Sequence, residues 1–175
     1  GQVALEVLFD GVRQQISLLT GLRAEGPPAA LYRTDTSVGV GEPLAAKAAL
    51  PVGDPATAGG VITELRLAAW IDKRGWAPAG MAFLVVTTEG WRTTQPCCDL
   101  RALKVTPTFG VTPDGGGRVE GVTAGSTSRP DPVFVVPAGF TVGSLELLLH
   151  VTFELGGTPG AVDGEPARLA IALPA

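Results

Sequence analysis

Two adjacent cysteines, Cys97 and Cys98, are the only cysteines in the chain and the first residues to consider for chemistry. Adjacent α-carbons lie about 3.8 Å apart, whereas an unstrained disulfide joins α-carbons about 4.4–6.8 Å apart, so a bond within this pair would strain the backbone. Catalytic redox pairs normally have the Cys-x-x-Cys spacing at the start of a helix, which this pair lacks. Three states stay open: two free thiols, a vicinal disulfide, or a bridge to another chain.

The single histidine, His150, lies in the run LELLLHVTFEL, whose alternation predicts a strand. Leu147 and Leu149 would face one side of that strand and His150 the more polar side. The acids nearest to it along the strand, Glu146 and Glu154, stand four residues away, roughly 13 Å at about 3.3 Å per residue, which is too far for a hydrogen bond. We expect an exposed strand histidine rather than a catalytic one.

Motifs for nucleophilic or metal chemistry are missing from the sequence. No serine stands in the G-x-S-x-G turn that holds a hydrolase nucleophile. One histidine and two adjacent cysteines do not readily supply a copper or a structural zinc site. Asp114, Asp131 and Asp163 fall in predicted turns and lack the spacing of a calcium loop. The sequence therefore predicts no catalytic residue, no metal site and no cofactor, and it leans away from an enzyme.

Three tryptophans, Trp70, Trp76 and Trp91, are the side chains best suited to recognition. Aromatic rings supply a large contact area at a small cost in entropy, and they recur at the centres of interfaces. Trp70 and Trp76 flank the turn DKRG, so the alternative is that tryptophans at strand ends cap the core. We treat all three as possible interaction residues.

The amino-acid composition narrows the class of partner that the chain could bind and the kind of organism that encodes it. The net charge is −4 with a pI near 5.0, and the thirteen basic residues are scattered, so nucleic acid is an improbable partner. The chain has no run of about 18 apolar residues that could span a membrane. Arginine outnumbers lysine ten to three and asparagine is absent, which indicates a high-GC bacterial source. Because the chain begins at Gly1, a signal peptide or anchor could have preceded it.

Glycine and proline punctuate a chain that is 45% hydrophobic, a pattern typical of many short strands. The turn Asp10–Gly11 between two alternating runs predicts a hairpin, with Leu5, Val7 and Phe9 on one face. The unbroken apolar run from Met81 predicts a central strand covered on both faces. A strand is expected at 62–71, with a helix as the alternative because Ile62, Leu65 and Ala69 also fit a helical stripe. Further strands are expected at 100–106, 118–123, 132–136, 144–155 and over the closing ARLAIAL, with a hairpin tip at 113–117. We therefore predict a single domain, 1–175, that forms a β-sandwich of about eight to ten short antiparallel strands.

Residues 20–60 give the least regular pattern. They are rich in Ala, Gly and Pro, with a short strand possible near 30–33 and a strand or helical turn near 44–50. A compact domain seldom holds so long a loop without structure. We expect irregular edge strands here or an arm laid over the sheet.

The segment GWAPAGMAFLVVTTEGW and the later PVFVVPAGFTVGSLELLL resemble exported, Ig-like (telokin-like) bacterial domains of unknown function. In those domains a Pro-Gly turn leads into a central strand and a later Val-Pro-x-Gly turn leads into another. The resemblance implies an Ig-like sandwich in a secreted or membrane-tethered protein, and it supplies no catalytic residues.

Three functions follow as hypotheses. The first is a non-enzymatic, extracytoplasmic interaction or accessory domain of a cell-envelope protein in a high-GC bacterium. The second is an envelope hydrolase or a small-ligand binder, for example of carbohydrate, with a site built from turns. The third is a subunit of a larger envelope complex that docks through residues 20–60. The first predicts a protein partner; none predicts nucleic acid, and the oligomeric state stays open.

Overall fold

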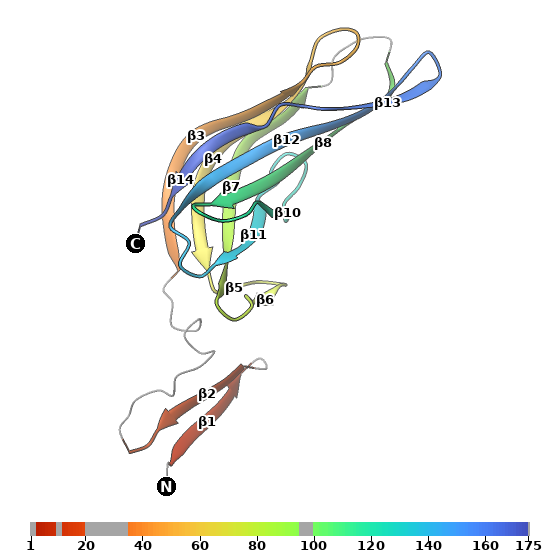
Figure 1. Cartoon of the computed structure of the whole chain (residues 1–175). Helices are drawn as coiled ribbons and strands as arrows, with labels where there is room; N and C mark the ends of the chain where they lie inside the picture. Colours follow the sequence, from red (N-terminus) through yellow and green to blue (C-terminus); the bar gives the residue numbers. More distant parts are fainter. Residues whose placement is uncertain (1–2, 10–11, 20–34, 95–99, 175) are drawn as a thin grey trace.

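The structure is a computed structural model that describes residues 3–9, 12–19, 35–94 and 100–174. Within these ranges the chain forms fourteen β-strands and no helix, and each pair of neighbouring strands is antiparallel (Figure 1). The predicted all-β antiparallel sandwich is therefore confirmed. No helix in the described ranges is long and apolar enough to cross a membrane.

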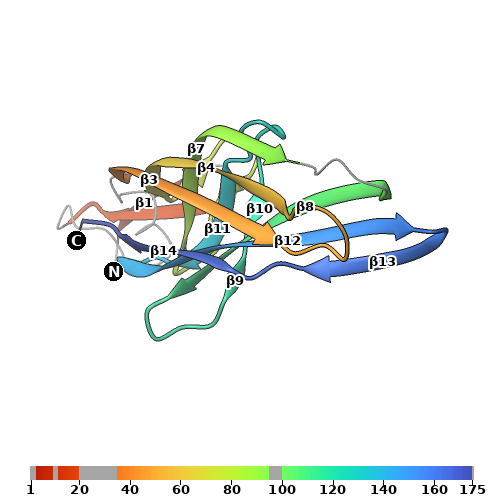
Figure 2. The ribbon, with the colours of Figure 1, turned by 90° about the horizontal axis from the view of Figure 1, so that it is seen from above.

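Two five-stranded sheets pack face to face as the layers of the sandwich (Figure 2). The first sheet has the order β10-β11-β7-β4-β3, with β10 (Val122–Thr123), β11 (Pro132–Pro137), β7 (Met81–Thr94), β4 (Ala56–Ala68) and β3 (Thr36–Ala48). The second contains β9 (Val119–Glu120), β8 (Arg101–Pro113), β12 (Val142–Leu155), β13 (Thr158–Asp163) and β14 (Ala167–Ala172). β13 and β14 pair with successive parts of one edge of β12, because β8 occupies its other edge.

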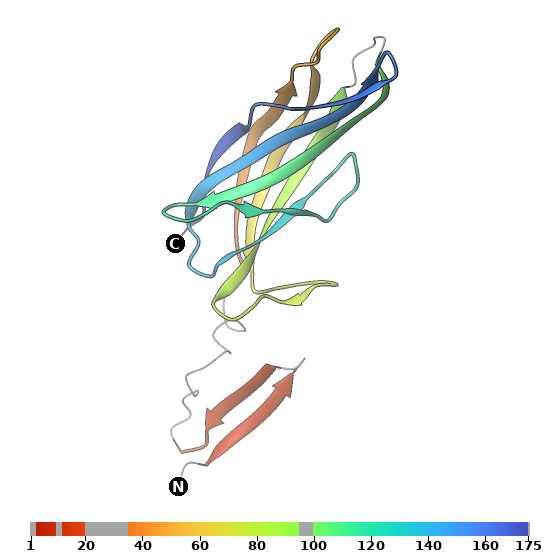
Figure 3. The ribbon, with the colours of Figure 1, turned by 45° about the vertical axis from the view of Figure 1, so that its right-hand side comes forward.

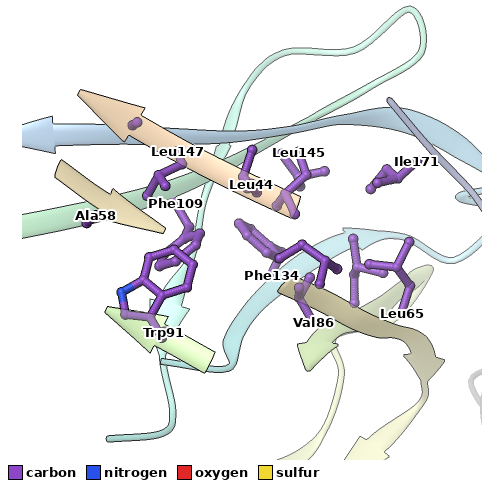
Figure 4. Close-up of a cluster of buried hydrophobic side chains, with 14 of the residues drawn as sticks. Leu44, Ala58, Leu65, Val86, Trp91, Phe109, Phe134, Leu145, Leu147 and Ile171 are labelled. Carbon is purple, nitrogen blue, oxygen red and sulfur yellow. The ribbon is translucent and has the colours of Figure 1, made fainter. Parts of the chain in front are cut away.

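The core lies between the two sheets and follows from strand alternation. Leu145, Leu147 and Leu149 on β12 are fully buried, and Leu84 and Val86 face them from β7. Figure 4 shows these layers meeting around Phe134 and around Trp91, whose ring lies 5.2 Å from that of Phe109 on the opposite sheet. One apolar core therefore joins both sheets.

Two crossings close the sandwich at its edges. On one side the chain passes from β9 to β10, and so from the second sheet to the first, through Gly121. A side chain at this glycine would come within 2.5 Å of the buried Phe134 ring, so only glycine fits. On the other side, Lys47 of β3 forms an isolated bridge with Glu165, in the link between β13 and β14.

Sequence and structure agree on most strands and differ on their lengths. β7 is covered on both faces, as predicted, and β1 (Ala4–Phe9) pairs with β2 (Val12–Ser17) in the predicted hairpin. β4 begins at Ala56, earlier than the predicted residue 62, and β13 was not predicted. Of residues 20–60, the segment 20–34 lies outside the described residues. The rest includes β3, which is an edge strand and is regular through Ala48 except for a bulge between Gly39 and Glu42.

Candidate functional site

The three tryptophans lie in two different environments. Trp70 and Trp76 stand opposite each other on a two-stranded ribbon formed by β5 (Trp70–Ile71) and β6 (Gly75–Trp76). Trp70 is 44% exposed, whereas Trp91 is only 5% exposed and belongs to the core. Trp70 is therefore placed where a partner could meet it, Trp76 is partly buried, and Trp91 is placed to pack the two sheets together.

The β5–β6 ribbon is folded by its own turn and by one hydrogen bond between the residues that flank it, Ala77 and Ala69. Lys73 and Gly75 both take positive φ in the turn, and the Arg74 amide donates to the Ile71 carbonyl at 3.2 Å. The Ala77 amide then donates to the Ala69 carbonyl at 2.8 Å. Figure 3 shows the ribbon leaving the end of the first sheet, at the junction of β4 and β7.

A second apolar cluster lies on the outer face of the first sheet, the face turned away from the core. Phe83 and Val133 are buried there, with Val85 and Val135 partly buried beside them. Val122 stands directly opposite Val133 on β10 and is 55% exposed. We call these five residues the outer patch. Ile71 and Ala77 of the ribbon region pack against the same cluster at one end, so the patch is covered only in part.

Polar residues of the first sheet border the outer patch. Arg66, opposite Val85 on β4, forms an ion pair with Asp35 at 2.8 Å. At the other end Asp131 accepts hydrogen bonds from the Thr88 amide and hydroxyl, at 2.8 and 3.1 Å, and forms an ion pair with Arg129. An apolar centre with a polar border is the anatomy of a protein–protein interface.

Only one buried side-chain polar atom in the described residues lacks a hydrogen-bond partner, the indole Nε1 of Trp76. Buried indole N–H groups usually find an acceptor. This donor lies on β6, in the ribbon whose Ile71 packs against the cluster of the outer patch.

The outer face of the second sheet carries His150 in a different setting from the one predicted. Its Nδ1 lies 2.7 Å from Asp163 Oδ1, and Asp163 stands directly opposite it on β13. Thr106 on β8 stands opposite its other side. Distance along the strand excludes Glu146 and Glu154 as partners, but the cross-strand neighbour Asp163 had been interpreted as a turn residue. His150 and Asp163 are both well exposed, which agrees with the predicted exposed strand histidine.

Glu146 shares that face but is nearly buried, at 9% exposed. Its two carboxylate oxygens accept hydrogen bonds from the Nε atoms of Arg118 at 3.1 Å and Arg168 at 2.9 Å. Arg118 also pairs with Glu120. These ion pairs fix the carboxylate, so Glu146 is a structural residue of β12.

The described residues contain no group of three histidine, cysteine or acidic side chains that could hold a metal ion. Cys97 and Cys98 lie outside those residues, so their state stays a prediction.

A pocket of about 350 Å³ opens at the end of the sandwich near Ala69 and Phe140, and one of about 750 Å³ lies beside the Lys47–Glu165 bridge. Alanine, glycine and proline make up much of both linings, and no charged cluster occupies the first.

The outer patch was only partly predictable. The unbroken apolar run of β7 indicated a second covered face, and Phe83 and Val85 are the residues that need it. Val122 falls in the predicted strand 118–123, but the structure breaks this run at Gly121 into β9 and β10, which belong to different sheets, and the sequence does not show that break. Comparison with protein-family models, with curated proteins and with solved structures finds no match.

Proposed function

We propose that this chain is a non-enzymatic interaction domain of an extracytoplasmic protein in the envelope of a high-GC bacterium, and that it binds a protein partner through the outer patch. The observation that carries the proposal is this second apolar cluster on the solvent side of the first sheet, bordered by polar residues. A sheet needs only one apolar face to pack against its partner sheet. On this second apolar face Phe83 and Val133 are already buried, whereas Val122 at the sheet edge is 55% exposed and is the part open to a partner.

The ribbon supports the same surface. Trp70 offers a large exposed ring next to Ile71, which packs against the cluster of the outer patch, and aromatic side chains concentrate binding energy at interfaces. The composition and the resemblance to exported Ig-like domains supply the proposed location and the Ig-like character of the sandwich.

Site-specific photocrosslinking in cells of the encoding organism tests the binding surface. A photoreactive phenylalanine analogue at Val122 or Trp70 should yield defined protein adducts. The same analogue at Val142, a 50% exposed valine on the second sheet, is the control and should yield none. Equal labelling at all three positions, or none at the patch, would reject the outer patch as the binding surface. Protease accessibility on intact cells tests the extracytoplasmic location.

A hydrolase remains the second candidate because His150 is oriented by Asp163 and stands opposite Thr106. A histidine fixed by a carboxylate beside a hydroxyl resembles the arrangement that activates a nucleophile. Labelling with a reactive phosphonate decides between the two proposals. Modification of Thr106 that is lost in His150→Gln would favour the hydrolase. If the chain is not labelled, the interaction domain is the better proposal.

A further inference from the structure

The β5–β6 ribbon has one covered face and one open face. Ile71 and Ala77 lie on one face and pack against the cluster of the outer patch. Trp70 and Trp76 stand directly opposite each other, so by alternation they share the other face. On that face Trp70 is 44% exposed and Trp76 is partly buried. The ribbon therefore presents the Trp70 ring on the side that is turned away from this cluster.

The turn of the ribbon carries two basic side chains next to each other. Lys73 and Arg74 are both exposed, and they are the only adjacent pair of basic residues in the chain. Neither forms an ion pair with a described residue, whereas Arg66 and Arg168 are paired with carboxylates. Asp72 precedes them and is also exposed, so one acid stands against two bases. We call Asp72, Lys73 and Arg74 the ribbon tip.

Lys73 has an unusual backbone conformation for a lysine. Its φ is 65°, in the left-handed region that glycine and asparagine adopt more readily. A lysine held in this region lowers stability relative to glycine. Strained residues of this kind concentrate at ligand-binding and switch regions, so Lys73 is the residue of the tip whose role is tested most directly.

We propose that the ribbon tip and Trp70 bind an acidic segment of the partner protein. The proposal rests on the proposed function, because it names the chemistry that the partner of this domain brings to the ribbon. Two neighbouring cations attract a segment with more than one carboxylate, and an arginine can hold a carboxylate through two parallel hydrogen bonds. Tryptophan and arginine are also residue types that dominate binding energy at interfaces, and Trp70 and Arg74 supply one of each.

Charge favours an acidic protein segment over an anionic membrane surface. The chain as a whole has a net charge of −4, so a broad anionic surface would repel the rest of the chain within a Debye length of about 8 Å. A single segment can meet the tip without approaching the rest, because the ribbon leaves the end of the first sheet (Figure 3). Specific interfaces use roughly 20–30 residues on each side, so the segment must belong to the same partner that meets the outer patch at Val122.

Photocrosslinking from the ribbon tip locates the segment. A photoreactive phenylalanine analogue at Asp72, in cells of the encoding organism, should give adducts with the same protein that crosslinks to Val122. Mass spectrometry of the digested adduct should place the crosslink in a stretch of the partner that contains several Asp or Glu residues. A crosslink in a neutral or basic stretch, or an adduct with lipid in place of protein, overturns the proposal.

Charge reversal tests the electrostatic contact. Lys73→Glu with Arg74→Glu should lower the yield of the Val122 adduct by roughly tenfold, because like charges then face each other across the interface. The matched control is Arg92→Glu with Lys104→Glu, which changes the net charge by the same amount at two other exposed cations, one at the far end of β7 from the ribbon and one on β8. The control should keep the wild-type yield, and equal yields from the two double variants would overturn the proposal.

Lys73→Gly separates the charge of this residue from its effect on the fold. Glycine adopts the φ of this position without strain, so the variant should resist urea at least as well as wild type. The yield of the Val122 adduct should nevertheless fall by roughly threefold, because one of the two cations is lost. An unchanged yield in this stable variant would remove Lys73 from the contact.

The outcomes distinguish the proposal from the proposed function. If Val122 still crosslinks to a protein and Asp72 does not, the ribbon tip lies outside the interface, which overturns the proposal and leaves the proposed function standing. If neither Val122 nor Trp70 gives a protein adduct, the proposed function is rejected and the acidic segment is rejected with it.

Discussion

At the scale of single residues, two glycines occupy positions where an added side chain would clash with a neighbour. An added Cβ at Gly110 would meet the guanidinium of Arg118 at 2.4 Å, whereas one at Gly121 would meet the Phe134 ring at 2.5 Å. The distances are similar but the neighbours differ. Arg118 is a long side chain that reaches Glu146 from a partly exposed position and can swing into solvent, while Phe134 is fully buried in the core.

The two glycines should therefore respond differently to alanine. Gly121→Ala should lower the free energy of unfolding by about 1–3 kcal/mol or more, because the core around Phe134 must shift. Gly110→Ala should cost about 1 kcal/mol or less, the loss of one partly exposed ion pair. Urea unfolding measures both. Gly110→Ala should also have little further effect in a Glu146→Gln background, since the Arg118–Glu146 contact is already weakened there, and additive effects would contradict this assignment.

At the scale of elements, β8 shows how an open edge is protected. The Phe109 carbonyl accepts from Gly121 beyond the edge of β8, so by alternation Val105 and Pro107 also direct their backbones toward that edge. β9 pairs only with Gly110 and Val111, which leaves the earlier part of β8 without a partner strand on that side in the described residues. Pro107 removes an amide donor from this edge, which limits pairing with other chains.

Pro107→Thr should restore that amide donor and let the open edge of β8 pair more readily with strands of other chains. We expect the free energy of unfolding to change by less than about 1 kcal/mol, because an edge position carries no ladder hydrogen bond to lose. Aggregation on mild heating, followed by light scattering, should become faster than for wild type. The control is Thr108→Val, because the backbone of Thr108 points toward β12. If both variants aggregate equally fast, Pro107 does not protect this edge.

The elements also show what the sequence could predict. β7 and β12 were recognisable because long apolar or alternating runs report burial directly. β3 was not, because its bulge at Gly41 shifts the alternation and its buried residues from Leu44 onward are mostly alanine. Trp70 and Trp91 could not be distinguished, since neither sequence context shows which side of the sheet faces the core. The cross-strand pair of His150 with Asp163 depends on register, which the sequence alone does not fix.

At the scale of the whole molecule, the two sheets form one cooperative unit. Trp91 and Phe109 meet across the layers, and the same cluster includes residues of β3, β4, β7, β8, β11, β12 and β14. The crossings at Gly121 and at the Lys47–Glu165 bridge hold the layers together along both sides. Among the residues that the structure describes, no strand of this unit pairs with the β1–β2 hairpin.

Trp91→Ala should therefore lower the stability of both sheets together. Replacing a buried tryptophan by alanine costs about 3–5 kcal/mol, through lost burial and the cavity that remains. Hydrogen exchange by mass spectrometry, in low denaturant and at submicromolar protein concentration, should show protection falling by the same free energy in β7 and in β12. Exchange of the β1–β2 amides should not change, because the hairpin makes no strand pairing with this core. If protection fell in β7 while β12 kept its wild-type value, the layers would unfold separately and the single core would be the wrong description of this sandwich.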